Sequence, residues 1–153
     1  MLPIYSMPGH PIRRLNQIHA ALFAEECGPF GMTSVQFAAL MALRSNPGAD
    51  ATRLSALIAF DRSTIGDVLD RMEAKGWIRR GPSPTDRRIE LLTLTPEGDA
   101  LLRQAEPMVE RVQQRLLEPI APSDRTEIVR LLGQIALAHN ETTSAPLRTG
   151  ATP

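Results

Sequence analysis

Apolar side chains recur about every three to four residues through most of this 153-residue chain, which is the spacing of one face of an α-helix. Proline, glycine and asparagine residues separate the periodic stretches from one another. The pattern predicts helices over about 11–27, 34–45, 51–58, 62–75, 96–118 and 124–139.

Short polar residues mark where several of these helices begin. Thr33 precedes Gln36 by three residues, which is the spacing of a capping box. Asp50, Asp61 and Ser123 stand just before the third, fourth and last predicted helices. At that position a side-chain oxygen can accept from an otherwise free backbone N–H group, so each residue is a candidate cap.

A β-hairpin is predicted between the fourth helix and the long fifth helix. Gly76 is a natural end for the fourth helix. Trp77–Arg80 is strand-like, residues 81–86 (Gly-Pro-Ser-Pro-Thr-Asp) are typical of a turn, and Ile89–Leu94 reads as the returning strand. The predicted fold class is therefore mainly α with a small β-hairpin.

The formal net charge is zero, but the charges are unevenly distributed. Between Arg53 and Arg88 there are eight basic and five acidic residues, whereas between Glu97 and Glu141 there are eight acidic and five basic residues. The middle of the chain is therefore the part suited to facing phosphate groups.

The third and fourth helices, joined by a short turn, are predicted to form a helix-turn-helix. In this motif the N-terminal residues of the second helix reach base edges in the major groove. Here they are Arg62, Ser63 and Thr64, an arginine and two hydroxyls that suit bases or phosphates. The hairpin carries four arginines around a proline-rich tip that could enter a minor groove, namely Arg79, Arg80, Arg87 and Arg88.

Two segments of the chain resemble the MarR family of bacterial regulators. Residues 54–80 read LSALIAFDRSTIGDVLDRMEAKGWIRR, and residues 83–98 read SPTDRRIELLTLTPEG. They meet almost throughout the family's pattern of Asp-Arg-Ser-Thr, Asp-Arg-hydrophobic-Glu-x-x-Gly, Asp-x-Arg and Leu-Thr. The helix order matches over roughly residues 10–140. The whole string at this spacing is specific, although a single Asp-Arg-Ser-Thr would not be.

The resemblance implies a winged helix-turn-helix protein that regulates transcription, most often as a repressor, and binds double-stranded DNA as a homodimer. The operator would be a pseudo-palindrome. The implied organisation is a pair of dimerisation regions (10–32 and 96–140) around a winged helix-turn-helix lobe (33–95). Composition predicts an irregular N-terminal segment (1–9), which holds two prolines and a glycine, and a disordered tail (141–153) rich in Thr, Ser, Pro and Gly.

Family resemblance also assigns roles in DNA binding. Arg62, Ser63 and Thr64 would contact the major groove, while Arg88 would enter the minor groove in an orientation held by Asp86. Each of these residues could instead be a solvated surface group, and the context favours DNA contact.

Three further positions are candidates for contact with DNA. Arg87 is equally consistent with DNA contact and with a solvated position on the wing. Asp67 stands where the family usually has a basic residue, and Gly66 precedes it. Asp67 repels phosphate but could accept from a cytosine amino group, and Gly66 could permit close approach to the duplex. Operator sequence therefore cannot be borrowed from relatives.

A small-molecule effector is a second expected partner, because family members often bind small aromatic acids between the dimerisation helices and the DNA lobe. Arg14, His19, Phe23 and Met41 are the candidate lining residues. Arg14 could grip a carboxylate through its guanidinium, or form a surface salt bridge. His19 could contact the effector, or be a buried histidine near the dimer interface.

Other functions find less support in the residues. Cys27 could be a redox sensor, but Glu25 and Glu26 would raise its pKa, so a packed thiol is favoured. A winged helix that binds protein instead of DNA is disfavoured by Arg62 and the wing arginines. No enzyme motif, cofactor motif or metal-ligand spacing is present, and we expect no cofactor and no metal. One cysteine and no long apolar run favour a cytoplasmic protein without a membrane partner.

Overall fold

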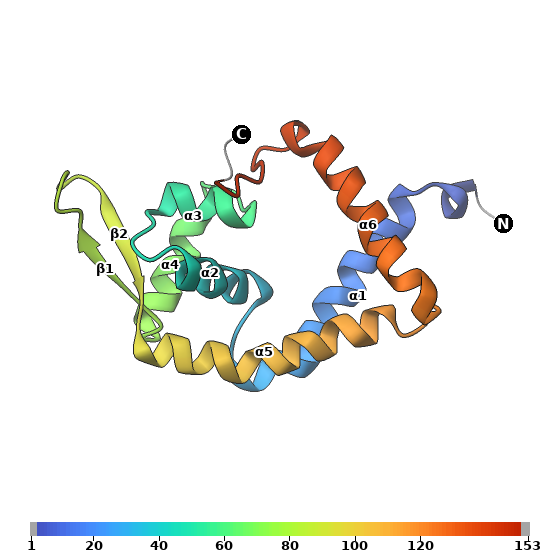
Figure 1. Ribbon diagram of the computed structural model, residues 1–153, viewed down its shortest axis with the longest axis horizontal. Helices are drawn as coiled ribbons and strands as arrows, with labels where there is room; N and C mark the ends of the chain where they lie inside the picture. Colours follow the sequence, from blue (N-terminus) through green and yellow to red (C-terminus); the bar gives the residue numbers. More distant parts are fainter. Residues whose placement is uncertain (1–2, 151–153) are drawn as a thin grey trace.

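The computed structural model describes residues 3–150 and is mainly helical, with one two-stranded sheet (Figure 1). No helix within that range is both long and apolar enough to span a membrane. The elements in chain order are η1 (Pro3–Ser6), α1 (Gly9–Cys27), η2 (Gly28–Phe30), α2 (Ser34–Ser45), α3 (Ala51–Ile58), α4 (Ile65–Ala74), β1 (Ile78–Pro82), β2 (Glu90–Leu94), α5 (Pro96–Leu117), α6 (Pro122–Ala138) and η3 (Asn140–Thr142).

Helices α2, α3 and α4 and the hairpin form one lobe, and α5 leads from the base of the hairpin to α1 and α6 (Figure 1). Helix α1 packs along α5 through a small apolar cluster that includes Phe23, Cys27 and Val112. Arg115 of α5 donates to Glu25 at 2.8 Å and to Glu26 at 2.9 Å, at the end of α1. The predicted first and fifth helices therefore lie side by side.

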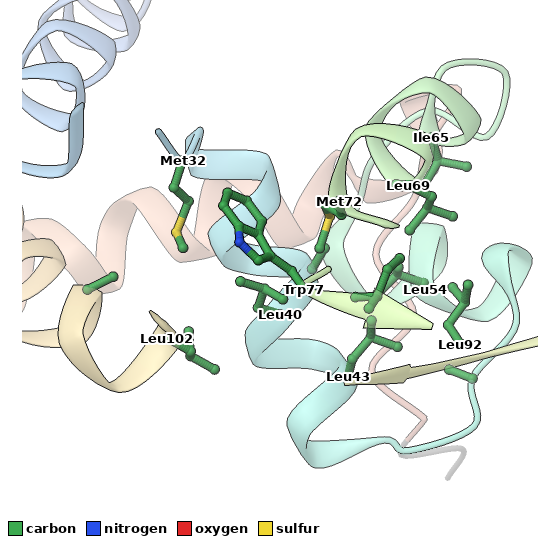
Figure 2. Close-up of a cluster of buried hydrophobic side chains, with 14 residues drawn as sticks. Met32, Leu40, Leu43, Leu54, Ile65, Leu69, Met72, Trp77, Leu92 and Leu102 are labelled. Atoms are coloured by element: carbon green, nitrogen blue, oxygen red, sulfur yellow. The ribbon is translucent and has the colours of Figure 1, made fainter. Parts of the chain in front are cut away.

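The core of the lobe draws side chains from every one of its elements (Figure 2). Leu54 of α3, Leu69 of α4 and Leu92 of β2 are each at most 2% exposed. Complete burial of one such side chain contributes about 1.5–3 kcal/mol relative to exposure. The packed core therefore fixes α4 and the hairpin relative to each other before any ligand is bound.

The hairpin is bonded along both edges of β2. Within the hairpin, Ile78 lies opposite Leu94 and Pro82 lies opposite Glu90 in an antiparallel register. On the other edge, the N–H of Leu92 donates to the carbonyl of Ala49 at 2.9 Å, and the N–H of Gly48 donates to Leu92 at 3.0 Å. The base of the wing is therefore anchored to the loop that follows α2.

The junction of the hairpin with α5 requires a glycine. A Cβ placed on Gly98 would lie 2.1 Å from the carbonyl oxygen of Trp77 and 2.9 Å from a methyl group of Leu94. Thr95 caps α5 by accepting from the N–H of Gly98 at 3.0 Å, and its hydroxyl donates to Gly76 at 2.6 Å. The helix can approach the strand this closely only because residue 98 has no side chain.

Several of the predicted helix ends are confirmed. Thr33 and Gln36 form both bonds of the capping box, and Asp50 caps α3 by accepting from the N–H of Arg53 at 2.7 Å. Gly76 follows α4 with a φ of +74°, a left-handed conformation that favours glycine.

Two predicted helix starts are corrected. Helix α4 begins at Ile65 rather than Arg62, because the Asp61 carboxylate accepts from the N–H of Ser63, two residues on, and stabilises a turn instead of a helix. Helix α6 begins at Pro122, whose fixed φ suits a first helical residue, and the N-cap is Ala121. Ser123 does not cap it, since its hydroxyl donates to the adjacent Asp124.

Both chain ends include local structure within the described range. In the segment 1–9, residues 3–6 form η1 and α1 begins at Gly9, while residues 1–2 lie outside the described range. In the tail 141–153, η3 extends to Thr142 and Arg148 pairs with Glu141, and the expected disorder stays a prediction. Residues 151–153 lie outside the described range.

Candidate nucleic-acid interface

The turn before α4, which we call the α4 turn (Asp61–Thr64), is organised by one aspartate. The carboxylate of Asp61 accepts from both the N–H and the hydroxyl of Ser63 at 2.7 Å. The backbone carbonyl of Asp61 accepts from the N–H groups of Thr64 and Ile65. The two Ser63 bonds, and after them one from Ser144, hold the pKa of the Asp61 carboxyl below its ordinary value. Asp61 is therefore ionised at neutral pH.

The side chains that follow Asp61 face solvent. Arg62, Ser63 and Thr64 are all exposed, and Arg62 forms no ion pair within residues 3–150. In α4 itself Gly66 and Asp67 are also exposed, while Ile65, Leu69 and Met72 hold the helix to the core. The predicted major-groove residues thus share one exposed turn and the first turn of a firmly anchored helix.

The wing tip is a closed loop rather than an open connection. The N–H of Ser83 donates to the carbonyl of Ile89 at 2.8 Å, and the N–H of Ile89 donates to Asp86 at 3.0 Å. Arg87 is exposed at this tip and pairs with no carboxylate in the described part of the chain. These bonds fix the backbone that presents Asp86, Arg87 and Arg88.

Arg88 is aimed by Asp86 through a two-point pair. Its Nε donates to one carboxylate oxygen of Asp86 at 3.1 Å, and its Nη2 donates to the other at 3.0 Å. The pair raises the pKa of Arg88 and lowers the pKa of the Asp86 carboxyl, so both groups are charged at neutral pH. The Arg88 side chain is nevertheless 90% exposed, so its remaining N–H donors are free to bind elsewhere.

The four hairpin arginines separate into two groups. Arg79, Arg87 and Arg88 are exposed, but Arg80 is half-buried and faces α4. Its guanidinium contacts Asp70 at 2.5 Å and Glu73 at 3.5 Å, and its N–H donates to Glu73 at 3.3 Å. Arg80 therefore joins the base of the wing to α4, a role that its place beside Arg79 in sequence does not reveal.

A second contact, made by Lys75 at the end of α4, also could not be predicted from the sequence. The Lys75 ammonium donates to the carbonyl oxygen of Gly31 at 2.5 Å and lies 4.4 Å from the centre of the Trp77 ring. Lys75 and Gly31 are 44 residues apart in the chain, so only folding brings them together. The C-terminal end of α4 is thus held to the segment that leads into α2.

The four predicted effector residues do not meet at one site. Phe23 is buried and packs edge-on against Phe37, while the half-buried His19 lies 6.3 Å from Phe23 between ring centres. Met41 lines a groove between α2 and α5, together with Phe37. Arg14 is exposed and donates to Gln17 on its own helix at 3.1 Å, so no contact joins it to that groove.

One guanidinium beside this groove was not among the predicted effector residues. Arg44, one helical turn after Met41, donates to its sulfur at 3.3 Å and forms an ion pair with Glu106 of α5. That ion pair lowers the pKa of Glu106, so the carboxyl stays ionised at neutral pH. The groove has a volume of about 380 Å³, and Val109 and Glu110 complete its α5 side.

Cys27 is completely buried in the cluster between α1 and α5. Burial raises the pKa of its thiol, and the nearby carboxylate of Glu26 raises it further. A redox sensor requires an accessible thiolate, and this site disfavours both access and ionisation.

Three packed helices with an exposed polar turn before the last, followed by an arginine-bearing hairpin, define a winged helix-turn-helix DNA-binding protein. The model of the MarR family matches residues 30–89, which include α2 to α4 and most of the wing. The chain belongs to the MarR family.

Relatives that match most of the chain also support its membership of this family. The HTH-type transcriptional repressor NicR of Pseudomonas putida is 31% identical over 124 residues, which are 81% of this chain and 78% of NicR. BpsR of Bordetella bronchiseptica, whose DNA binding is regulated by 6-hydroxynicotinic acid, is 32% identical, with a TM-score of 0.81 over 85% of this chain and 93% of BpsR. The repressor CouR, bound to a 23-mer DNA duplex, is 30% identical, with a TM-score of 0.83 over 89% of this chain and 96% of CouR.

Proposed function

We propose that this protein is a homodimeric repressor that binds a pseudo-palindromic operator and is released from it by a small aromatic acid. The observation that carries the proposal is the pairing of two exposed, preorganised elements in one lobe. The α4 turn presents Arg62, Ser63 and Thr64, and the wing presents Arg88 on its Asp86 support. The Arg80 ion pairs fix the wing against α4, so both elements would bind as one rigid unit.

In the complex, we assign the α4 turn and the N-terminal end of α4 to the major groove. Arg62 suits a guanine edge or a phosphate, and Ser63 and Thr64 suit phosphates or bases. Asp67 faces the same groove from the first turn of α4 and would favour a cytosine amino group. Arg88 enters the adjacent minor groove, with Arg87 beside it as a phosphate contact.

Dimerisation is supported by an apolar surface on α1 and α6. On α1, Ile12, Leu15 and Ile18 are 40–51% exposed. On α6, Val129, Leu132 and Ile135 are 46–54% exposed. A soluble protein seldom leaves so many large apolar side chains on two of its helices uncovered, and a second copy would cover them.

The effector proposal is supported by the aromatic and apolar surface near His19, Phe23, Phe37 and Met41, and by the aromatic acid that regulates BpsR. We place the effector's ring in the groove between α2 and α5. Arg44 pairs with Glu106, which lines this groove, so the effector's carboxylate would compete with Glu106 for it. Arg14 would contribute only if the partner subunit brought it close.

DNA binding is tested by selecting bound sequences from a random duplex pool and measuring affinity for the selected duplex across salt concentrations. We expect a pseudo-palindrome with half-site centres about one helical turn apart, and affinity that falls steeply as salt rises. Enrichment of no sequence above the starting pool would overturn the proposal.

Effector binding is tested by thermal-shift measurements with a panel of aromatic carboxylates that includes 6-hydroxynicotinic acid. A binding acid should raise the melting temperature and weaken operator binding, and the operator should weaken binding of the acid by the same factor. Arg44→Gln should abolish the shift, and Arg103→Gln is the matched control, because Arg103 is an α5 arginine that pairs with Asp99. A panel without a single stabilising acid would remove the effector assignment while leaving DNA binding intact.

A further inference from the structure

Residues 140–150, which we call the C-terminal strap, lie against the DNA-binding lobe and reach α3 (Figure 1). The backbone N–H of Arg148 donates to the carbonyl of Ala56 at 2.7 Å. In return, the guanidinium of Arg53 donates to the carbonyl of Arg148 at 3.2 Å. The strap is therefore bonded to α3 from both directions, although its composition of Thr, Ser, Pro and Gly predicts disorder.

The strap is also braced internally, so it reaches the lobe in a defined conformation. The amide side chain of Asn140 exchanges two hydrogen bonds with the backbone of Leu147, at 2.8 and 3.2 Å. The guanidinium of Arg148 pairs with Glu141, which lowers the pKa of that carboxyl. The loop between these residues is closed at its base by both interactions.

One strap residue contacts the α4 turn directly. The hydroxyl of Ser144 donates to the second carboxylate oxygen of Asp61 at 3.3 Å, while the first oxygen holds Ser63. A small cavity of about 160 Å³ between strap and lobe is lined by Phe60 and Arg62 on one side and by Pro146 on the other. The strap thus lies beside the residues assigned to the major groove.

The α4 turn is a segment that benefits from such support. Ala59, at the end of α3, has a φ of +50°, a left-handed conformation that disfavours residues with a side chain. Between Ala59 and Ile65, Phe60 is only partly buried against the core. Arg62, Ser63 and Thr64 are exposed. Bonds to Asp61 are therefore a main source of order in the turn.

We propose that the C-terminal strap positions the α4 turn for DNA, with Ser144 as the positioning residue and the Arg148 backbone as its anchor on α3. Ser144 does not touch DNA in this account. It restricts the Asp61 carboxylate, which in turn fixes Ser63 and the direction of Arg62. The proposal rests on the proposed DNA binding, since it concerns the residues assigned to the major groove.

The test compares full-length dimeric variants on two probes, the selected operator and a random duplex of equal length. Ser144→Ala removes the hydroxyl that reaches Asp61, and Thr143→Ala is the matched control, because its hydroxyl donates to Asn140 within the strap. We expect Ser144→Ala to bind the operator about five-fold more weakly, the effect of one hydrogen bond, and Thr143→Ala to bind as the parent does. Ser144→Thr should restore most of the affinity.

Two further measurements separate positioning from a structural role. Affinity for the random duplex and the salt dependence should be unchanged in Ser144→Ala, because no phosphate contact is lost. Hydrogen exchange at the Ser63 amide should be faster in the free variant, with an unchanged melting temperature. A chain that ends at His139 lacks the whole strap, and should lose about ten-fold or more of operator affinity if both the Ser144 and the Arg148 contacts matter.

The outcomes are distinct. Operator affinity equal to the parent's in both Ser144→Ala and the shortened chain overturns the positioning role. Tighter operator binding by the shortened chain also overturns it, because the strap would then cover the turn. If the shortened chain loses its dimer, Ser144→Ala and its control alone decide. If the parent binds no duplex better than random DNA, the proposed function fails, and not the strap.

Discussion

Among individual residues, Arg88 shows most directly how geometry prepares a contact before the ligand arrives. The pair with Asp86 uses two of its donors and leaves the guanidinium exposed. Much of the conformational entropy of this long side chain is therefore lost during folding and not during binding. The same logic applies to Asp61, which fixes Ser63 in the α4 turn.

We predict that Arg88→Ala weakens operator binding about ten- to hundred-fold, because it removes one specific groove contact. The dimer and the melting temperature should be unchanged, since among residues 3–150 the side chain forms hydrogen bonds to Asp86 alone. Gel shift and sizing chromatography measure both. Arg79→Ala, which removes another exposed hairpin arginine, is the control, and an equal loss in both variants would argue for general charge instead of a specific contact.

We predict that the thiol of Cys27 is unreactive in the folded protein. Its thiol is buried and its pKa is raised, so the folded protein should resist iodoacetamide at pH 8, while the chain in denaturant reacts readily. Because the folded pKa lies above the unfolded one, Cys27 favours the folded state less as pH rises above about 8.5. Equal reaction rates for folded and unfolded protein would contradict the burial and reopen a redox role.

The residues that the sequence could predict are those whose partners lie nearby in the chain. Thr33 and Gln36 are three residues apart, which is the spacing of a capping box, and Asp86 and Arg88 are two residues apart in a short motif whose pairing the family resemblance implies. Arg44 with Glu106 and Lys75 with Gly31 are separated by 62 and 44 residues. Which distant carboxylate or carbonyl such a cation finds depends on how whole helices pack, and periodicity does not determine that.

At the scale of elements, the junction between wing and α5 depends on the absence of one methyl group. We predict that Gly98→Ala destabilises the protein by about 1–3 kcal/mol, because the new Cβ would overlap the Trp77 carbonyl and the helix must shift. The melting temperature should fall, and operator affinity should fall too because the wing moves with the helix. Thermal unfolding of free protein measures the first effect.

Gly66→Ala is the matched control, and it separates stability from DNA contact. Apart from its chain neighbours and the backbone of its own helix, no atom of the described residues lies within 4 Å of a Cβ placed on Gly66, which is exposed in α4. Alanine should therefore raise stability by up to about 1 kcal/mol through helix propensity. If α4 approaches the duplex closely at this point, operator affinity falls while stability rises. Lower stability in Gly66→Ala than in Gly98→Ala would contradict the assigned packing.

The elements themselves were predicted well, and their ends less well, for a physical reason. Helices α2, α3 and α5 begin where Thr33, Asp50 and Thr95 cap them. Helix α4 begins late because the Asp61 side chain bonds within its own turn, which competes with the helical alternative. The strap was predicted to be disordered from its composition, because its contacts to a distant helix, such as that of Arg148 with Ala56, leave no pattern in the sequence.

At the scale of the whole molecule, the exposed apolar face of α6 allows a test of the proposed dimer. Ile135→Glu places a charge in that face and should shift the protein from dimer to monomer at micromolar concentration, because an unpaired charge is costly to bury. Sedimentation velocity measures the change. Gln134→Glu alters the adjacent α6 position and is the control. A parent protein that sediments as a monomer would contradict the dimer assignment.

In the proposed complex, the α4 turn and the wing of each subunit bind adjacent grooves of one duplex. Hydroxyl-radical footprinting of the selected operator tests it most directly, with the parent and Arg88→Ala compared at concentrations that saturate both. We expect both proteins to protect two half-sites about one helical turn apart. The parent should also protect the minor groove beside each half-site, and Arg88→Ala should lose that protection. A footprint on a single half-site, or identical footprints for both proteins, would contradict it.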